Sequence, residues 1–175
     1  MNILKILSSI IVFANLGSVS FAYINLSEYF PSKTSIEYYI PPSTGCAINA
    51  VYLAISKIHH KSILIEEIAN DFKKFEGPPY SMLDIVSILD THSMQTIPLK
   101  LTSPREVFKY KFKYGILYLK ESNKGIGHFS FCFRGKDNKL WIADPMFGNE
   151  CVEFTSESEV FKLFTGIILK IEYLK

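Results

Sequence analysis

Residues 128–145 have the sequence HFSFCFRGKDNKLWIADP. Two largely apolar runs, 128–134 and 138–145, flank the turn-forming residues 135–137. Such runs joined by a short polar turn are typical of an antiparallel β-hairpin. We therefore expect a hairpin here, as part of a larger and mostly antiparallel sheet.

This hairpin brings His128 and Asp144 to one face of the sheet. If the loop holds residues 135–137, His128 lies directly across from Asp144. Side-chain direction repeats every two residues, so a register shifted by one residue on each strand keeps both on the same face. Cross-strand neighbours lie about 5 Å apart at Cβ, close enough for a carboxylate to orient an imidazole. Plainer interpretations stay open, because histidines also pack in cores and Asp-Pro pairs often end strands.

Cys46 is the candidate nucleophile. Apolar residues recur at helical spacing after it as far as about His59, which predicts a buried helix that opens at Cys46. A helix N-terminus supplies unpaired N–H donors and a partial positive charge that favour a thiolate. A lone cysteine beside alanine and isoleucine is also common in protein cores. With the hairpin, Cys46 completes a Cys-His-Asp set in which His128 takes the thiol proton and Asp144 orients the ring.

The rest of the chain separates into a helical first half and a strand-rich second half. Further helices are predicted at about 63–75 and 82–91, the second with a capping box at its start. The strand-like runs are 95–101, 115–120, 128–134, 140–144, 151–154 and 167–174. Short helices are expected at the capping boxes Ser103–Glu106 and Ser156–Glu159. Helices followed by mostly antiparallel strands define an α+β fold.

The first 22 residues are typical of a secretory signal peptide. A single lysine precedes a short apolar run, and Ser20 and Ala22 have the small side chains that signal peptidase accepts, so we expect cleavage after Ala22. Residues 23–175 then form a single domain. The apolar run is shorter than the roughly 20 residues of a membrane span, although an uncleaved anchor stays an alternative. We expect a periplasmic or secreted bacterial protein, without stable membrane insertion after cleavage.

Composition narrows the class of protein further. The 175 residues are 48% hydrophobic and 21% charged, which excludes disorder and favours one globular domain. Basic and acidic residues are scattered, so no nucleic-acid partner is expected. The three cysteines have no C-x-x-C spacing, and we expect no metal site and no cofactor. The odd cysteine count also raises the hypothesis of a disulfide between Cys132 and Cys151. His59, His60 and His92 end helices, and we interpret them as structural.

Four segments in order carry a family resemblance. They are Cys46-Ala-Ile-Asn-Ala, Tyr80-Ser-Met-Leu-Asp-Ile, Gly127-His-Phe-Ser-Phe and Trp141-Ile-Ala-Asp-Pro-Met-Phe-Gly-Asn. Together they resemble the double-glycine (bacteriocin-processing) cysteine peptidases, in particular the stand-alone secreted type, over about residues 35–174. The resemblance implies a papain-like fold, with N-terminal helices packed on a mostly antiparallel sheet. It also implies cleavage of a peptide or small protein, often after a Gly-Gly leader, with Cys46 as nucleophile, His128 as base and then acid, and Asp144 as the orienting residue.

The sequence departs from this family's pattern near the nucleophile. The family usually has a Gln five or six residues before the Cys, whose amide helps to hold the oxyanion, and Pro41 and Ile40 occupy those positions here. The Gly that usually follows the Cys is an Ala. Loss of one oxyanion donor costs roughly 10² to 10³ in rate. The candidate donors that remain are the N–H of Cys46 and the side chains of Ser43 and Thr44.

Three functions stay open from the sequence. The first is a secreted or periplasmic cysteine peptidase that acts on a peptide or small protein. The second is a catalytically weak or inactive peptidase-like module that holds a peptide without cutting it, as the missing Gln suggests. The third is a cell-wall amidase of the related papain-like type, although the Asp-Pro motif favours the first.

Overall fold

The computed structural model describes residues 23–25, 30, 42–61, 63–120, 127–147 and 150–173. The expected signal peptide, residues 1–22, lies outside these ranges. Three helices precede most of the strands, as predicted: α2 (Pro42–His59), α3 (Ile65–Phe72) and α4 (Met82–Thr91). No helix in the described ranges is both long and apolar enough to cross a membrane.

Within the described residues, seven strands form one sheet in the order β1-β6-β5-β4-β3-β7-β2. They are β1 (Tyr23–Asn25), β2 (Met94–Lys100), β3 (Tyr114–Lys120), β4 (Gly127–Arg134), β5 (Leu140–Ala143), β6 (Glu150–Glu153) and β7 (Phe164–Tyr173). Every neighbouring pair is antiparallel. All the predicted strands are present close to their predicted positions. The α+β fold class is therefore confirmed.

Strand β1 was not predicted, because a strand this short shows no alternation of apolar and polar residues. It pairs with β6, with Tyr23 opposite Val152, and forms one edge of the sheet. Phe30 follows it and is buried, with ring centroids 6.2 Å from Phe131 and 5.9 Å from Phe133. The segment before α2 thus contributes both to the sheet edge and to the core.

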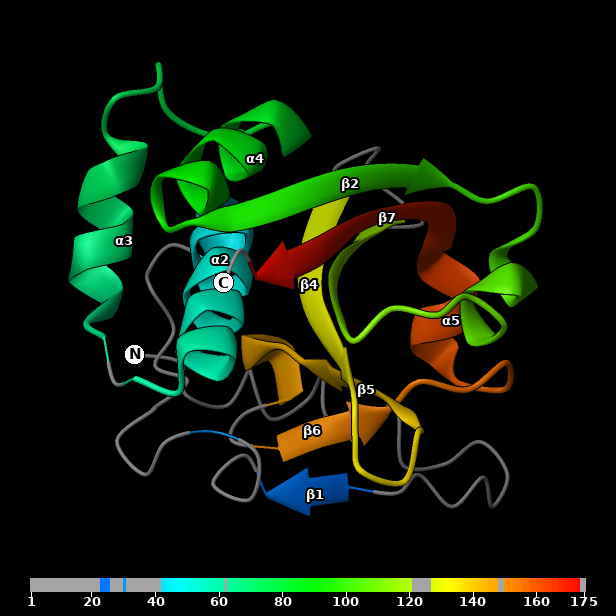
Figure 1. Ribbon diagram of the computed structural model, residues 1–175. Coiled ribbons are helices and arrows are strands. Elements are labelled where there is room, and N and C mark those ends of the chain that lie inside the picture. Colours follow the sequence, from blue (N-terminus) through cyan, green and yellow to red (C-terminus); the bar gives the residue numbers. More distant parts are fainter. Residues whose placement is uncertain are drawn as a thin grey trace, which may run out of the picture.

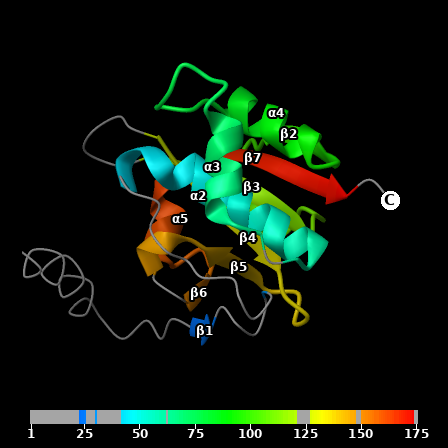
Figure 2. The same ribbon diagram turned by 90° about the vertical axis from the view of Figure 1, so that its left-hand side faces the viewer.

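Apolar side chains pack on both faces of the sheet. On one face the alternate β4 residues Phe129, Phe131 and Phe133 pack with α2, α3 and α4. The other face packs with the short helices η3 (Pro104–Phe108) and α5 (Glu159–Leu163). In Figure 1 the three long helices lie at one side of the sheet and α5 at the other, and Figure 2 views the molecule from the helical side. The long β4 therefore runs between two layers.

The capping boxes predicted at Ser81 and Ser103 are present. The one predicted at Ser156 is wrong, because Ser158 caps α5 by accepting a hydrogen bond from the N–H of Phe161. The Ser156 hydroxyl instead donates to the neighbouring glutamate. The sequence therefore predicts this short helix correctly but not the residue that caps it.

Cys132 and Cys151 lie on opposite faces of the sheet, so the disulfide hypothesis is wrong. Neither forms a disulfide, and both residues are fully buried. Cys132 pairs with Ile142 and Cys151 with Ala143, and these adjacent residues of β5 point to opposite faces. Burial also raises the pKa of the Cys132 thiol above its usual range, which keeps it protonated at neutral pH.

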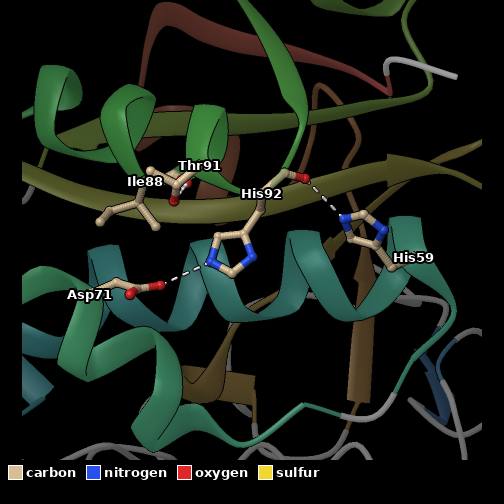
Figure 3. Close-up of polar contacts among 5 residues, drawn as sticks. All are labelled: His59, Asp71, Ile88, Thr91 and His92. Carbon is tan, nitrogen blue, oxygen red and sulfur yellow. Dashed lines mark hydrogen bonds and ion pairs between the residues drawn. The ribbon is translucent and has the colours of Figure 1, made fainter.

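The C-terminal ends of α2, α3 and α4 are joined by polar contacts (Figure 3). His92 Nε2 lies 2.9 Å from Asp71 Oδ2, and His59 Nε2 lies 3.1 Å from the backbone oxygen of His92. The His59 ring also makes an edge contact with Tyr173 of β7. These contacts support the structural interpretation of His59 and His92. The cluster lies at the opposite end of α2 from Cys46.

Candidate active site

Cys46 lies near the N-terminal end of α2 and is partly exposed, whereas the next residues of the helix are buried. The helix begins at Pro42, so the prediction that it opens at Cys46 is wrong and the thiol sits in the second turn. Proline is well suited to the first helical position because its φ is already fixed there, which explains the earlier start. Ile40, Pro41 and the side chains that precede Gly45 lie outside the described residues, so the oxyanion donors stay a prediction.

The β4–β5 hairpin has a loop of the predicted length, placed one residue later. The N–H of Gly135 donates to the backbone oxygen of Lys139, which leaves residues 136–138 as the loop. Asn138 closes it with a φ of 64°, a left-handed conformation that asparagine tolerates and that three-residue hairpin loops favour. Because the shift is one residue on each strand, the side chains keep their predicted faces.

This register changes which residue lies opposite the carboxylate. Phe131 and Ala143 are the last paired residues of β4 and β5. If the register is continued by one residue on each strand, Ser130 lies directly across from Asp144. His128 is then the diagonal neighbour of Asp144 on the same face. The prediction of a shared face is therefore correct, whereas a directly opposed His128 is not.

The Asp144 carboxylate is the centre of a small hydrogen-bond network. Its Oδ2 lies 2.7 Å from His128 Nε2 and also accepts a hydrogen bond from the Ser130 hydroxyl. Its Oδ1 accepts a hydrogen bond of 3.0 Å from the N–H of Met146. The Asp144 side chain is 2% exposed and that of His128 is 22% exposed. Three donors thus satisfy a carboxylate that is almost fully buried.

The surroundings of His128 favour its charged form. Burial alone disfavours the imidazolium, but the hydrogen bond and charge of Asp144, with a hydrogen bond and charge from Cys46, raise the pKa of His128 to about 10. Because Nε2 faces Asp144, Nδ1 is the ring nitrogen left for the thiol. The structure therefore brings Cys46, His128 and Asp144 into one connected set. Such a set can hold a thiolate beside an imidazolium at neutral pH.

We expect the contribution of His128 to stability to depend on pH. Its folded-state pKa of about 10 lies above the ordinary value of 6.5, so protonation stabilises the fold. The contribution is fully present below about pH 6.5 and is lost as the pH rises toward 10. The difference in free energy of unfolding between the unaltered chain and His128→Ala should shrink by roughly 2–4 kcal/mol over this interval, measured by urea denaturation. A difference that is constant with pH would contradict this assignment.

Two partners of Asp144 were missed by the sequence analysis. One is the N–H of Met146, a backbone group in the turn after β5 that no side-chain pattern reveals. The other is the Ser130 hydroxyl, and here a signal exists, because Ser130 interrupts an apolar run two residues after His128. Among the described residues, no group of His, Cys, Asp and Glu side chains could hold a metal ion.

Comparison with known proteins relates this arrangement to peptidases. The peptidase C39 family matches residues 43–173. The peptidase domain of Streptococcus ComA, a bifunctional ABC transporter involved in quorum sensing, has a TM-score of 0.59 at 17% identity, over 75% of this chain and 93% of that chain. A double glycine motif protease from an AMS/PCAT transporter, solved with the leader peptide, has a TM-score of 0.61 at 15% identity, over 83% and 98%. No curated protein gave a match to the chain.

The fold and the family match define the class of protein as a papain-like cysteine peptidase. More specifically, the chain belongs to the peptidase C39 family, whose match covers most of its length. The family resemblance read from the sequence motifs is therefore confirmed. The solved peptidase domains share the fold, with helices packed on an antiparallel sheet.

Proposed function

We propose that this peptidase hydrolyses its substrate through a triad of Cys46, His128 and Asp144. The observation that carries the proposal is the position of the His128 ring, which is held by Asp144 at 2.7 Å between Nε2 and Oδ2. Cys46 lies close enough to contribute, with Asp144, to the raised pKa of His128. A partly exposed thiol completes the set, while the other two cysteines are buried. These three residues bring a thiol, an imidazole and a carboxylate together.

The proposed reaction follows from this geometry. His128 Nδ1 takes the proton of Cys46, and the thiolate attacks the carbonyl carbon of the scissile peptide bond. The imidazolium then gives its proton to the leaving amine as the C–N bond breaks, which leaves a thioester on Cys46. His128 next takes a proton from water, which attacks the thioester and releases the carboxylic acid and the thiol. Asp144 stays ionised throughout, fixing the ring and stabilising its charge.

The proposed substrate is a peptide or small protein with a Gly-Gly leader. The support is family membership, together with a solved relative of the same fold that holds a leader peptide. A panel of synthetic peptides that contain Gly-Gly, Gly-Ala or Ala-Ala at the scissile position tests this, with mass spectrometry to locate the cut. Cleavage without preference among the three would leave the peptidase activity standing and exclude the leader specificity.

We further propose that the protein acts in the periplasm or outside the cell. The support is the sequence of residues 1–22, with a short apolar run and small residues before Tyr23. Expressed with its native N-terminus in a Gram-negative host, the protein should appear in the periplasmic fraction with Tyr23 as its first residue. An intact N-terminus in the cytoplasmic fraction would contradict this proposal.

Alkylation of Cys46 tests the triad directly. At neutral pH, iodoacetamide should modify Cys46 on the order of ten times faster than free cysteine, because the thiolate persists beside the imidazolium. His128→Ala should remove this advantage, whereas His60→Ala, which changes an exposed histidine immediately after α2, should not. Mass spectrometry of the peptide that contains Cys46 separates its reaction from that of the buried cysteines. A thiol no faster than free cysteine in the unaltered chain would favour the peptide-holding module instead.

A further inference from the structure

Ser130 contacts the proposed triad but is not the nucleophile, the base or the orienting carboxylate. Its hydroxyl donates to Asp144 Oδ2, the same oxygen that faces His128 Nε2. The residue is 1% exposed, and the register of β4 and β5 places it directly across from Asp144. This contact joins the two strands of the hairpin at the point where they carry the histidine and the aspartate.

A buried hydroxyl in this part of β4 requires an explanation. Residues 129 and 131–133 are apolar and buried, and a serine among them is unfavourable unless its hydroxyl is hydrogen-bonded. The partner of Ser130 is the side chain of Asp144, not the backbone of its own strand. A serine at this position therefore supplies a hydrogen-bond donor to the carboxylate, whereas packing of the core alone would favour an apolar residue.

We propose that Ser130 is a positioning residue of this peptidase, whose hydroxyl holds the Asp144 carboxylate in the plane that His128 requires. The proposal rests on the proposed triad. Met146 N–H holds Oδ1 and the Ser130 hydroxyl holds Oδ2, so both oxygens are anchored independently of the ring. The carboxylate then keeps its orientation while His128 moves a proton between Cys46 and the leaving group.

The same hydroxyl also stabilises the negative charge of Asp144. A carboxylate that is 2% exposed depends on its donors, and a hydrogen bond to the charged form favours that form. The titratable groups that meet here are Asp144 after β5, His128 of β4 and Cys46 of α2. Without the Ser130 hydroxyl, the ionised carboxylate loses support, and so does the imidazolium that holds the thiolate.

The experiment compares the unaltered chain with Ser130→Ala, Ser130→Thr and Ser56→Ala. Ser130→Thr keeps the hydroxyl, and threonine is favoured in strands. Ser56→Ala is the matched control, because Ser56 is a fully buried serine of α2 whose hydroxyl has no hydrogen-bond partner among the described residues. For each protein, the rate of Cys46 alkylation is measured from pH 4 to pH 10, and kcat/KM is measured on a cleaved peptide.

Ser130→Ala should lower kcat/KM and the alkylation rate at neutral pH roughly tenfold, the effect of losing a hydrogen bond to a charged group. The pH at which alkylation reaches half its maximum on the acid side should rise, because the imidazolium is less well supported. Ser130→Thr should restore kcat/KM and the alkylation rate to within about threefold of the unaltered chain. Ser56→Ala should change neither of these rates.

The proposal is overturned if Ser130→Ala matches the unaltered chain. It is also overturned if the alanine variant is slower with an unchanged pH profile, as a purely structural defect would be, or if a folded threonine variant is as slow as alanine. Failure of the triad itself has a different signature, because Cys46 of the unaltered chain would then be no more reactive than free cysteine. That result would remove the role of Ser130 together with the proposed function.

Discussion

Cys46→Ala should reduce kcat/KM for peptide cleavage by roughly 10⁵ to 10⁶, the scale of removing the nucleophile from a protease triad. No covalent intermediate can form without the sulfur, and His128 and Asp144 are left with no nucleophile to activate. The fold should be unaffected, because Cys46 is partly exposed and the helix around it stays intact. The measurement is kcat/KM on a peptide that the unaltered chain cleaves, with circular dichroism as a check on folding.

Cys132 and Cys151 provide matched controls for this substitution. Both are fully buried, on opposite faces of the sheet, and neither is part of the Cys46–His128–Asp144 set. Cys132→Ala and Cys151→Ala should each lower the free energy of unfolding by about 1 kcal/mol while keeping kcat/KM within about threefold. Loss of activity in either variant, or retained activity in Cys46→Ala, would assign the reaction to a different nucleophile.

Most of the helices and strands could be predicted from local features of the sequence. The helix at 82–91 has the predicted bounds, and the hairpin of β4 and β5 has the predicted loop length. These features depend on local chemistry, namely a capping box and turn-forming residues, which a single sequence displays. Strand β1 depends instead on pairing with β6, which lies more than a hundred residues away, and its own few residues show no pattern.

The candidate site was predictable as a set of residues but not as a geometry. Period-two alternation puts His128, Ser130 and Asp144 on one face in any even register, so the histidine and the aspartate were found without the register. Whether His128 or Ser130 lies directly opposite Asp144 depends on where the loop begins. Because the loop begins one residue later than predicted, Ser130 takes that position. The second-turn position of Cys46 depends on Pro42 being helical, which the apolar pattern did not reveal.

Asp144→Asn should lower kcat/KM by roughly 10² to 10³, nearly as much as Asp144→Ala. The change looks conservative, because papain-like proteases with a Cys-His-Asn triad exist and the corresponding change in a serine protease costs about 10⁴ mainly through the wrong histidine tautomer. In a thiolate–imidazolium pair both ring nitrogens carry protons, so the tautomer is not in question. The cost here comes from the three donors that surround the carboxylate.

An asparagine at position 144 has one acceptor oxygen for those donors and adds two N–H groups of its own. If its oxygen faces His128 and Ser130, its amide nitrogen opposes the N–H of Met146. If its oxygen instead accepts from Met146, its amide nitrogen faces His128 Nε2, which must then lose its proton. Either orientation leaves a buried donor unpaired or a neutral imidazole, and only an ionised carboxylate satisfies all three contacts.

The Asp71–His92 pair is the control for this argument. Its geometry is similar, with 2.9 Å between His92 Nε2 and Asp71 Oδ2, but the two side chains are 30% and 42% exposed, and it lies among the C-terminal ends of the helices (Figure 3). Asp71→Asn should change the free energy of unfolding by less than about 1 kcal/mol and leave kcat/KM unchanged. If Asp144→Asn also left kcat/KM unchanged, an amide could replace the carboxylate at position 144. The three donors around Asp144 would then not explain how His128 is held.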